Sequence, residues 1–413
     1  MLSTITLYIK NLLPVASQKR CLSILTWYVF SLATPSDKHS QAFASKISKK
    51  DDSLFSDLLG KEISFSLEVL NRSSKRRLNK LLKVRKPIHN QSPWTVCLII
   101  DSTLHERSSE KVDNGQKHYH GNKYVTGHLW TNIGLLINGQ YVPLPPIVFY
   151  TRDYCKLRGI PYKTEHEKIS DFLRNFSFKQ FSKKIHPNEI LVLLDSGYDN
   201  KKIQSAIISR QWDFISSLKC CRNISDKPKD WKRIDRYFGD GRRPFISVRL
   251  ESYRGKRKVL SRYQVKQRVG LLKGVRQRVK LLCSKRLKDK RMKFLACSNI
   301  KVSPKLILLA YKKRWTIEIF HREVKSYLGL EDAGVKRFNS LHSHVHFVYV
   351  TYNMLKERYP GDGIRVAQMK TQWDFEQDKG KGLLKQLSLI NGSQHAKTQI
   401  RSDIEALEIL KAA

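Results

Sequence analysis

The stretch Thr95-Val-Cys-Leu-Ile-Ile-Asp101 combines β-branched and other apolar residues and ends on a carboxylate. Such a run is typical of a central strand that is buried on both faces. A second run, Glu189–Leu194, has the same character and is followed directly by Asp195. If the two strands are neighbours, their two aspartates lie together at one edge of the sheet.

The segments around these two strands predict an α/β fold. Asn138 and Gly139 separate two apolar runs, which is the strongest short signal for a β-hairpin. The predicted elements are strands over 124–137, 140–150 and 212–218, and helices over 163–178 and 199–210. Their order predicts a mixed sheet with helices on its faces.

The composition points to a polyanionic partner. The 413 residues include 78 Lys plus Arg against 36 Asp plus Glu, which gives a formal net charge of +42. Self-repulsion of this size is relieved by binding a polyanion such as nucleic acid. Because 40% of the residues are hydrophobic, the chain can build real cores, and a disordered basic tail is excluded. At roughly 100 to 200 residues per domain, two to four units are expected.

The cysteines and the apolar segments indicate an intracellular protein. Seven cysteines form no Cys-x-x-Cys pair, so neither a disulfide framework nor a zinc knuckle is predicted. The apolar run Cys21–Ala33 is too short to span a membrane and fits a buried helix better than a signal peptide. We therefore expect a cytoplasmic protein without a membrane partner.

Two basic segments stand out. Eight of the fifteen residues in Arg72–Lys86 are basic, which fits either a DNA-contacting helix or a solvated helix face between domains. Residues 254–293 hold seventeen basic residues and one acid, Asp289. Basic and apolar residues often alternate there, which predicts strands with one face on a core and the other on phosphate.

A strong helix is predicted over Ser303–Leu330, with Ser303 as its N-cap. At about 100° per residue, five polar side chains share one stripe about 80° wide. The stripe consists of Tyr311, Arg314, Glu318, Arg322 and Lys325. The opposite face carries Ile317, Phe320 and Val324, which should anchor the helix to a core.

Three acids on separate elements, Asp101, Asp195 and Glu318, form a candidate metal site. Carboxylate oxygens suit Mg²⁺ or Mn²⁺, which take further ligands from water and from substrate phosphate. Two such ions, about 3.5 to 4 Å apart, would activate the attacking oxygen and stabilise the leaving one in phosphoryl transfer. Arg and Lys on the same helix would bind the flanking phosphates.

The spacing of Tyr311, Arg314, Glu318 and Lys325 matches the Tyr-Arg-Glu-Lys signature of the IS4 family of DDE transposases. Asp-Ser-Thr from Asp101 and Asp-Ser-Gly-Tyr-Asp-Asn from Asp195 resemble the two aspartate motifs of that family. The resemblance covers roughly residues 90–350.

The resemblance implies a ribonuclease-H-like core with a β-rich insertion and a metal-binding triad of Asp101, Asp195 and Glu318. It also implies that the basic and tyrosine side chains of the stripe position transposon-end DNA. Some members stack a flipped base on an aromatic residue of the insertion. Trp231, the only tryptophan of the predicted insertion, is a candidate for that role. Trp315 either stacks on DNA or, as we expect, packs in a core.

Five segments follow from these patterns and from the resemblance. They are a helical DNA-binding region (1–90), the first part of the core (91–219), the basic insertion (220–294), the second part of the core (295–360) and a helical tail (361–413).

The function predicted is that of a DNA transposase, which cuts at transposon ends and joins them to target DNA in a bacterial or archaeal cell. Double-stranded DNA is the expected partner, and holding two ends together implies a homodimer. Two alternatives stay open. One is a non-catalytic DNA-binding protein derived from a transposase, and the other is a metal-dependent nuclease of the same fold that cuts without joining.

Several other side chains compete for these roles. Asp199 fits the N-cap region of the next helix, Glu323 lies off the stripe, and Glu331 follows Gly329, where the helix should end. The first histidine cluster consists of His342, His344 and His346, which are either zinc ligands or packed side chains. The second consists of His118 and His120, which either contact DNA or form a polar strand end.

Overall fold

The structure is a computed structural model, which describes residues 1–107, 112–120, 122–181, 185–239, 244–254, 257–287 and 291–389. Asp289 and the last part of the predicted C-terminal tail, 390–413, lie outside the described residues.

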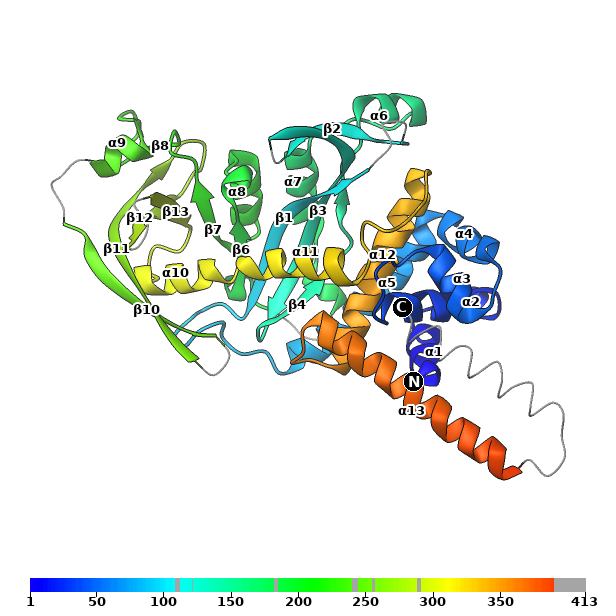
Figure 1. The fold of residues 1–413 in the computed structure, drawn as a ribbon. Helices are drawn as coiled ribbons and strands as arrows, with labels where there is room; N and C mark the ends of the chain where they lie inside the picture. Colours follow the sequence, from blue (N-terminus) through cyan, green and yellow to red (C-terminus); the bar gives the residue numbers. More distant parts are fainter. Residues whose placement is uncertain are drawn as a thin grey trace.

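The described residues form a mixed α/β structure around one large sheet (Figure 1). Its strand order is β2-β3-β1-β6-β7-β13-β12-β11-β8-β9, with β4 and β5 paired to β3 and β10 paired to β11. The strands are β1 (Val96–Glu106), β2 (Gln116–His120), β3 (Lys123–Ile137), β4 (Gln140–Pro143), β5 (Ile147–Val148), β6 (Ile190–Leu194), β7 (Asp213–Leu218), β8 (Asn223–Ser225), β9 (Lys232–Arg233), β10 (Ile246–Arg254), β11 (Arg257–Leu272), β12 (Arg278–Arg286) and β13 (Met292–Cys297). The prediction of a mixed sheet is confirmed.

The predicted hairpin is present, but its second strand is short. Asn138 and Gly139 adopt φ values of 51° and 76°, as a tight two-residue turn between strands requires. β4 ends at Pro143 instead of continuing to Tyr150. The reason is chemical, because Pro143, Pro145 and Pro146 have no N–H group to donate to a neighbouring strand.

Helices cover both faces of the sheet. Those after β5 are α6 (Arg152–Arg158), α7 (Glu165–Asn175), α8 (Lys201–Ser209), α9 (Ile234–Gly239), α10 (Pro304–Lys312), α11 (Trp315–Tyr327), α12 (Phe338–Arg358) and α13 (Ile364–Leu389), with short 3-10 turns at Phe178–Gln180, Pro187–Glu189 and Ser196–Tyr198. α7 and α8 pack on one face, whereas α10, α11 and α12 pack on the other (Figure 1).

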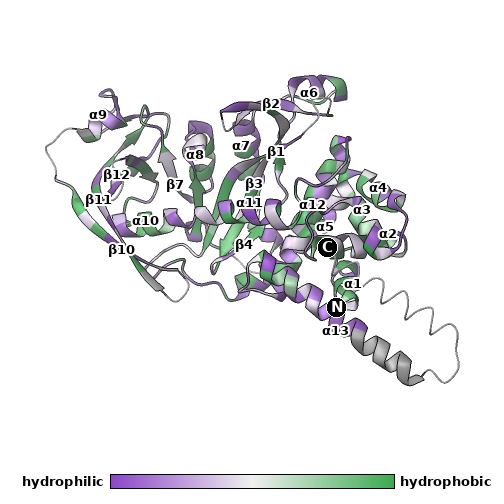
Figure 2. Ribbon diagram, in the orientation of Figure 1, coloured by the Kyte–Doolittle hydropathy of each residue, from purple (hydrophilic) through white to green (hydrophobic). Residues whose placement is uncertain are grey.

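Side chains alternate between these two faces along β1. Leu98 and Ile100 belong to the core under α7 and α8, whereas Cys97 and Ile99 belong to the core under α10, α11 and α12. Because strand side chains repeat every two residues, Asp101 points to the second face. The first half of β1, residues 96–100, is hydrophobic, and Figure 2 shows green stretches in the strands of the central sheet.

The predicted insertion continues the central sheet. β13 pairs antiparallel with β7, from Phe294 opposite Leu218 to Cys297 opposite Ile215. β12, β11 and β10 then follow outward by antiparallel pairing. The predicted alternation holds only in part there. Val265 is buried, but Leu260 is 60% exposed because the β10–β11 arm extends beyond the helices that cover the rest of the sheet (Figure 1).

Five helices precede the sheet. They are α1 (Leu2–Lys10), α2 (Val15–Leu32), α3 (Gln41–Ser48), α4 (Asp52–Gly60) and α5 (Ile63–Lys83). α2, α4 and α5 dock on α12, with the largest contact made by α5, while α1 packs on α2 and α3 packs on α2 and α4. In the part of the chain that the structure describes, no helix is both long and apolar enough to cross a membrane.

Most cations of the basic segment 72–86 have partners inside the protein. Arg77 is buried and donates hydrogen bonds to the carbonyl of Tyr141 (2.8 Å) and to Asn353 (3.2 Å). The other ion pairs are Arg72–Glu68, Arg76–Glu357, Lys80–Glu357 and Arg85–Glu189. These contacts give the segment a structural role between α12, the sheet and the N-terminal helices.

Candidate active site

Two helices stand where a single long helix was predicted. Ser303 caps α10 as expected, since its side chain accepts a hydrogen bond from the Leu306 N–H (3.3 Å). The helical pattern is then interrupted at Lys313 and Arg314, where the Arg314 N–H donates to the carbonyl three residues earlier, on Tyr311 (3.0 Å). This tighter turn separates α10 from α11, which follow one another across the sheet face (Figure 1).

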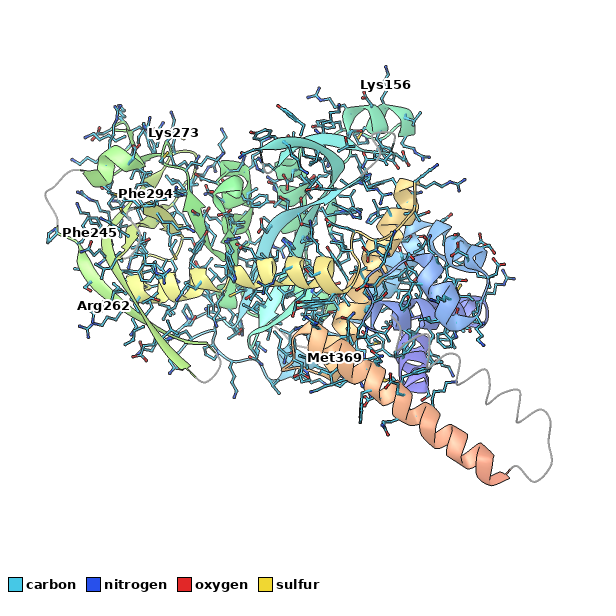
Figure 3. All side chains as sticks on the ribbon, viewed as in Figure 1. Lys156, Phe245, Arg262, Lys273, Phe294 and Met369 are labelled. Carbon is cyan, nitrogen blue, oxygen red and sulfur yellow. The ribbon has the colours of Figure 1, made fainter. Side chains whose placement is uncertain are left out.

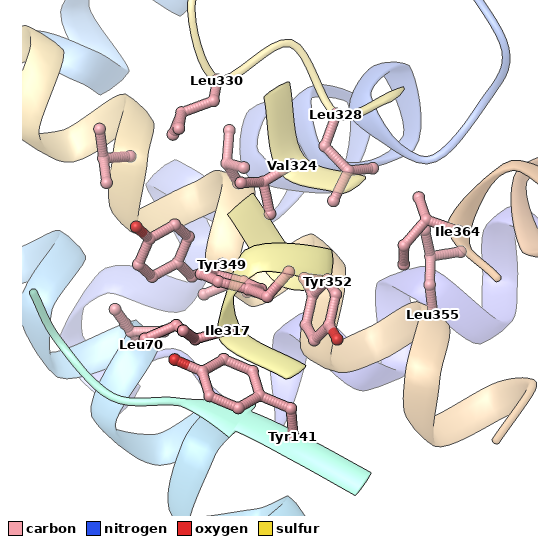
Figure 4. Packing of buried hydrophobic residues seen from close by; sticks show 14 of the residues in the cluster. Leu70, Tyr141, Ile317, Val324, Leu328, Leu330, Tyr349, Tyr352, Leu355 and Ile364 are labelled. Atoms are coloured by element: carbon pink, nitrogen blue, oxygen red, sulfur yellow. The ribbon is translucent and has the colours of Figure 1, made fainter. Parts of the chain in front are cut away.

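The apolar face of α11 anchors it as predicted. Ile317, Phe320 and Val324 are fully buried. Figure 4 shows Ile317 and Val324 among side chains from other elements, which include Tyr349 of α12 and Tyr141 of β4. With this face fixed, the polar side of α11 is held against the sheet edge at β1 and β6.

The two predicted aspartates follow equivalent positions of neighbouring parallel strands. β1 and β6 are paired in register up to Ile100 opposite Leu194. The next residue on each strand is an aspartate, Asp101 and Asp195, and both belong to the face that carries α11. The sequence prediction that these strands are neighbours is therefore confirmed.

Arg314 links two of the predicted acids. Its guanidinium lies 3.2 Å from Asp101 and also contacts Glu318, four residues later on α11. All three side chains are largely buried, with exposed fractions of 11% for Arg314, 20% for Asp101 and 28% for Glu318. We call Asp101, Asp195, Glu318 and Arg314 the acidic cluster.

The electrostatics of Asp101 show that the three acids act on one another. Burial raises the pKa of Asp101 to about 6. The Arg314 guanidinium opposes this rise, whereas the negative charges of Asp195 and Glu318 add to it. Such mutual repulsion between carboxylates is relieved when a cation binds among them.

In the arrangement that the structure describes, Asp101, Asp195 and Glu318 do not form a complete metal site. Among the described residues, no three His, Cys, Asp or Glu side chains stand close enough together to hold an ion. Arg314 occupies the position between Asp101 and Glu318 instead. The donor set still fits Mg²⁺ or Mn²⁺, because it consists of carboxylates that already bind a cationic group. Metal binding at this point requires the guanidinium to move aside.

The competing acids are engaged elsewhere. Asp199 is paired with Arg222 (3.4 Å), while its neighbour Asn200 caps α8. Glu323 is buried and accepts hydrogen bonds from Lys356 (3.3 Å) and from the Ile364 N–H (3.1 Å). Glu331 pairs with Lys325 at 2.7 Å.

Tyr311 and Lys293 extend the cluster toward β7 and β13. Tyr311 is 8% exposed, and burial, followed by the charge of Asp195, raises its pKa to about 12. The Lys293 ammonium lies 4.8 Å from the centre of the Tyr311 ring. Partial burial lowers the pKa of Lys293, although Asp195 and Glu318 counteract the shift. The sequence analysis missed Lys293, which was one of seventeen basic residues in its segment.

His321 and Asn132 were also missed. Asn132 stands opposite Asp101 in the β1–β3 register. Its amide donates to His321 Nε2 (2.9 Å), and its carbonyl oxygen accepts from the Tyr349 hydroxyl. Burial lowers the pKa of His321 to about 3, so this side chain is neutral. A signal did exist, because at about 100° per residue His321 lies only about 20° from Arg314 around the helix.

The last two residues of the predicted stripe differ in environment. The Lys325 ammonium donates to the carbonyl of Leu104 on β1 (2.5 Å) and pairs with Glu331. Arg322 is exposed one turn beyond Glu318. Lys325 therefore ties α11 to β1, whereas Arg322 faces solvent.

A groove of about 1730 Å³ opens between α10 and the strands β10–β13 and reaches Tyr311 and Arg314. We call it the basic groove. Its cationic lining residues are Arg286, Arg291, Lys293, Lys312, Lys313 and Arg314, and among the described lining residues Glu251 is the single acid.

Trp315 lines this groove and is 58% exposed, so the expectation that it packs in a core is wrong. Trp315 is the first residue of α11. Trp231 is only half-buried and lies just before β9, the last strand in the sheet order.

The histidine cluster of α12 is part of the core. His344 contacts the Tyr28 hydroxyl (2.7 Å) and the carbonyl of Gly329 (2.8 Å), and His346 contacts Ser66 (2.9 Å). Burial lowers the pKa of His342 to about 4. All three are packed side chains, which is the second of the two interpretations given for them in the sequence analysis. His118 is half-buried on β2.

Comparison with known families agrees with this geometry. Residues 174–354 match the transposase DDE domain. The match contains Asp195 and Glu318, whereas Asp101 lies upstream of it. It supports a DDE transposase without distinguishing the IS4 family from others. A search of curated proteins found no match.

Proposed function

We propose that this protein is an IS4-type DNA transposase that cuts at transposon ends and joins the freed 3′-hydroxyl to target DNA. The contacts of Arg314 with Asp101 and Glu318, the electrostatic influence of Asp195 on both Asp101 and Arg314, and the adjoining basic groove carry the proposal. The match to the transposase DDE domain supports it. The central strand order β3-β1-β6-β7, with β1 antiparallel to β3 and parallel to β6, agrees with a ribonuclease-H-like core.

Asp101, Asp195 and Glu318 would hold Mg²⁺, or Mn²⁺ in its place. When bound, the metal would activate the attacking oxygen and stabilise the leaving one. The side chains of this chain then position the DNA. Arg314, released from the acids, would bind the phosphate beside the cut bidentately. Tyr311 and Lys293 would border the same phosphate, and Arg322 would contact the next stretch of backbone.

The side chains of the basic groove would bind the DNA. The exposed cations of the groove would hold duplex DNA through its phosphates, so the affinity for DNA should fall steeply as the salt concentration rises. Trp315 is placed to stack on an unpaired base at the cut, a role for which it is better situated than Trp231. The helical region 1–90 is proposed to bind the transposon end, and a homodimer would hold two ends together.

The test is cleavage of DNA that carries the terminal inverted repeats flanking the gene, in the presence of Mg²⁺. Wild-type protein should nick the ends, and Asp195→Ala should lower the rate by about 100-fold or more. Glu106→Gln, which changes an exposed carboxylate at the end of β1, is the matched control and should leave the rate unchanged. Unchanged nicking by Asp195→Ala would overturn the proposal. Nicking without joining would instead favour a nuclease.

A further inference from the structure

The hairpin of β2 and β3 carries an exposed pair of tyrosines that the acidic cluster and the basic groove do not use. Tyr119 and Tyr124 stand directly opposite each other in the register, with ring centres 5.3 Å apart. They are 66% and 74% exposed. Two large rings left in solvent side by side are typical of a contact surface.

The surroundings of the two rings are basic. Between Asp113 and Asp153 the sequence contains no acidic residue. Lys117 lies two residues before Tyr119, on the same side of β2, whereas Lys123, directly before Tyr124, lies on the other side of the hairpin. α6 contributes exposed Arg152 and Lys156, and Lys156 projects away from the rest of the molecule (Figure 3). We call Tyr119, Tyr124, Lys117, Arg152 and Lys156 the hairpin patch.

The hairpin patch borders a cavity. A cavity of about 620 Å³ lies between the start of β2 and α6, and its lining includes Lys117 and Arg152. Two acids also line this cavity, namely Asp113, which accepts a hydrogen bond from the Phe338 N–H (3.1 Å), and Asp153, which is exposed on α6. Around the two tyrosines themselves the surface offers phenol hydroxyls and cations, which are the groups that contact phosphate and sugar in DNA complexes.

The two tyrosines share a sheet face with the acidic cluster. Asn132, the partner of Asp101, and Tyr124 are both even-numbered residues of β3 and so point the same way. They lie eight residues apart on one strand, which spans about 27 Å at about 3.4 Å per residue. At about 3.4 Å of rise per base pair, this distance corresponds to roughly eight base pairs of duplex.

We propose that the hairpin patch is a second DNA contact, which binds the backbone of duplex DNA about eight base pairs from the scissile phosphate, whose proposed place is beside Asp101. The inference rests on the proposed function for the location of the cut. The tyrosine hydroxyls and the lysine and arginine cations donate to phosphate oxygens, and the rings pack on deoxyribose. The contact is independent of sequence, because no side chain of the patch is required to reach a base edge.

The experiment places a photoreactive benzoyl-phenylalanine at position 119 of the full chain, with the same substitution at Trp373 as the matched control. Trp373 is 62% exposed on α13, at the opposite end of the molecule (Figure 1). The probe is a labelled 30-base-pair duplex in EDTA, so no cleavage is needed. Position 119 should cross-link to DNA at least fivefold more than position 373.

Affinity gives the second measurement. The double variant Tyr119→Ser/Tyr124→Ser should bind the same duplex about fivefold more weakly, and Trp373→Ser should bind like the wild type. A cross-link from position 119 to a second protein copy, or equal DNA cross-linking at both positions, would overturn the proposal. If the patch cross-links to DNA but Asp195→Ala still cuts transposon ends, only the proposed function fails.

Discussion

The acidic cluster and the basic groove adjoin on one face of the same sheet, yet they treat positive charge in opposite ways. In the cluster, Arg314 is 11% exposed and is neutralised by Asp101 and Glu318. In the groove, Arg286 and Arg291 are exposed, and a single acid lines the whole described surface. Compensated, buried charges can be rearranged for chemistry, whereas uncompensated, exposed charges attract a polyanion. If the protein acts as proposed, changes in the acidic cluster and changes in the basic groove should therefore affect cleavage and DNA binding separately.

The largest expected effect separates cutting from binding. Glu318→Gln keeps the size of the side chain but removes one charge from the acidic cluster, so cleavage should fall by about 100- to 1,000-fold. The affinity for duplex DNA in EDTA should stay within about twofold, because the groove is unchanged. Cleavage kinetics and fluorescence anisotropy measure the two quantities. A parallel loss of both would contradict the separation.

The reverse effect is expected in the groove. Arg286→Ala/Arg291→Ala removes two phosphate contacts, which should weaken binding by roughly 10- to 60-fold at 0.1 M salt and lower the salt slope by about 2. Cleavage at saturating protein should be nearly unchanged. Arg365→Ala/Lys370→Ala removes two exposed charges of α13, outside the proposed DNA contacts, and serves as the control. An unaltered salt slope in the groove variant would remove these arginines from the interface.

Trp315 lines the basic groove and directly follows Arg314 of the acidic cluster, so its substitution tests the boundary between the two regions. If its ring stacks on an unpaired base, Trp315→Ala should weaken binding to DNA with unpaired nucleotides by about fivefold or more, since each base stack contributes about 1–3 kcal/mol. Trp315→Phe should retain most of the affinity, and fully paired DNA should discriminate little. The same measurement on Trp231→Ala tests the original candidate. A larger loss there than at Trp315 would reverse the assignment.

The smallest effect is thermodynamic. The pKa of Asp101 is raised to about 6 in the folded protein, so the folded state binds more protons than the unfolded state between about pH 4 and pH 6. Stability from this group therefore falls as pH rises through that window. Without metal, Asp101→Asn should raise the melting temperature by about 2–4 °C at pH 8, and the gain should shrink at pH 4.5. Calorimetry at both pH values checks this, and an equal gain at both would show that Asp101 has an ordinary pKa.

Much of the fold could be predicted from local sequence patterns. Buried strands ending on Asp101 and Asp195, the Asn138–Gly139 turn and the apolar face of α11 were all predictable, because each depends on a short run of residues. The three acids could be chosen from the same runs. Their neighbourhood on adjacent strands required only that β1 and β6 pair in parallel.

Features that depend on long-range pairing were missed. Asn132 joins the site only because of its register opposite Asp101, which a loop between the two strands hides from the sequence. Lys293 reaches Tyr311 only because β13 pairs with β7. The interruption at Arg314 was not predictable either, because no proline or glycine marks it in the sequence.

The pairing of β7 with β13 has a mechanical consequence. The groove strands and the strands that carry the two aspartates belong to one hydrogen-bonded sheet, so the residues proposed to hold DNA and those proposed to face the scissile phosphate would keep a fixed separation. The paired strands therefore form one continuous spacer between the groove and the acids. DNA seated in the groove would meet the acids at a set number of nucleotides, so the position of the cut would be determined by the length of β-structure between them.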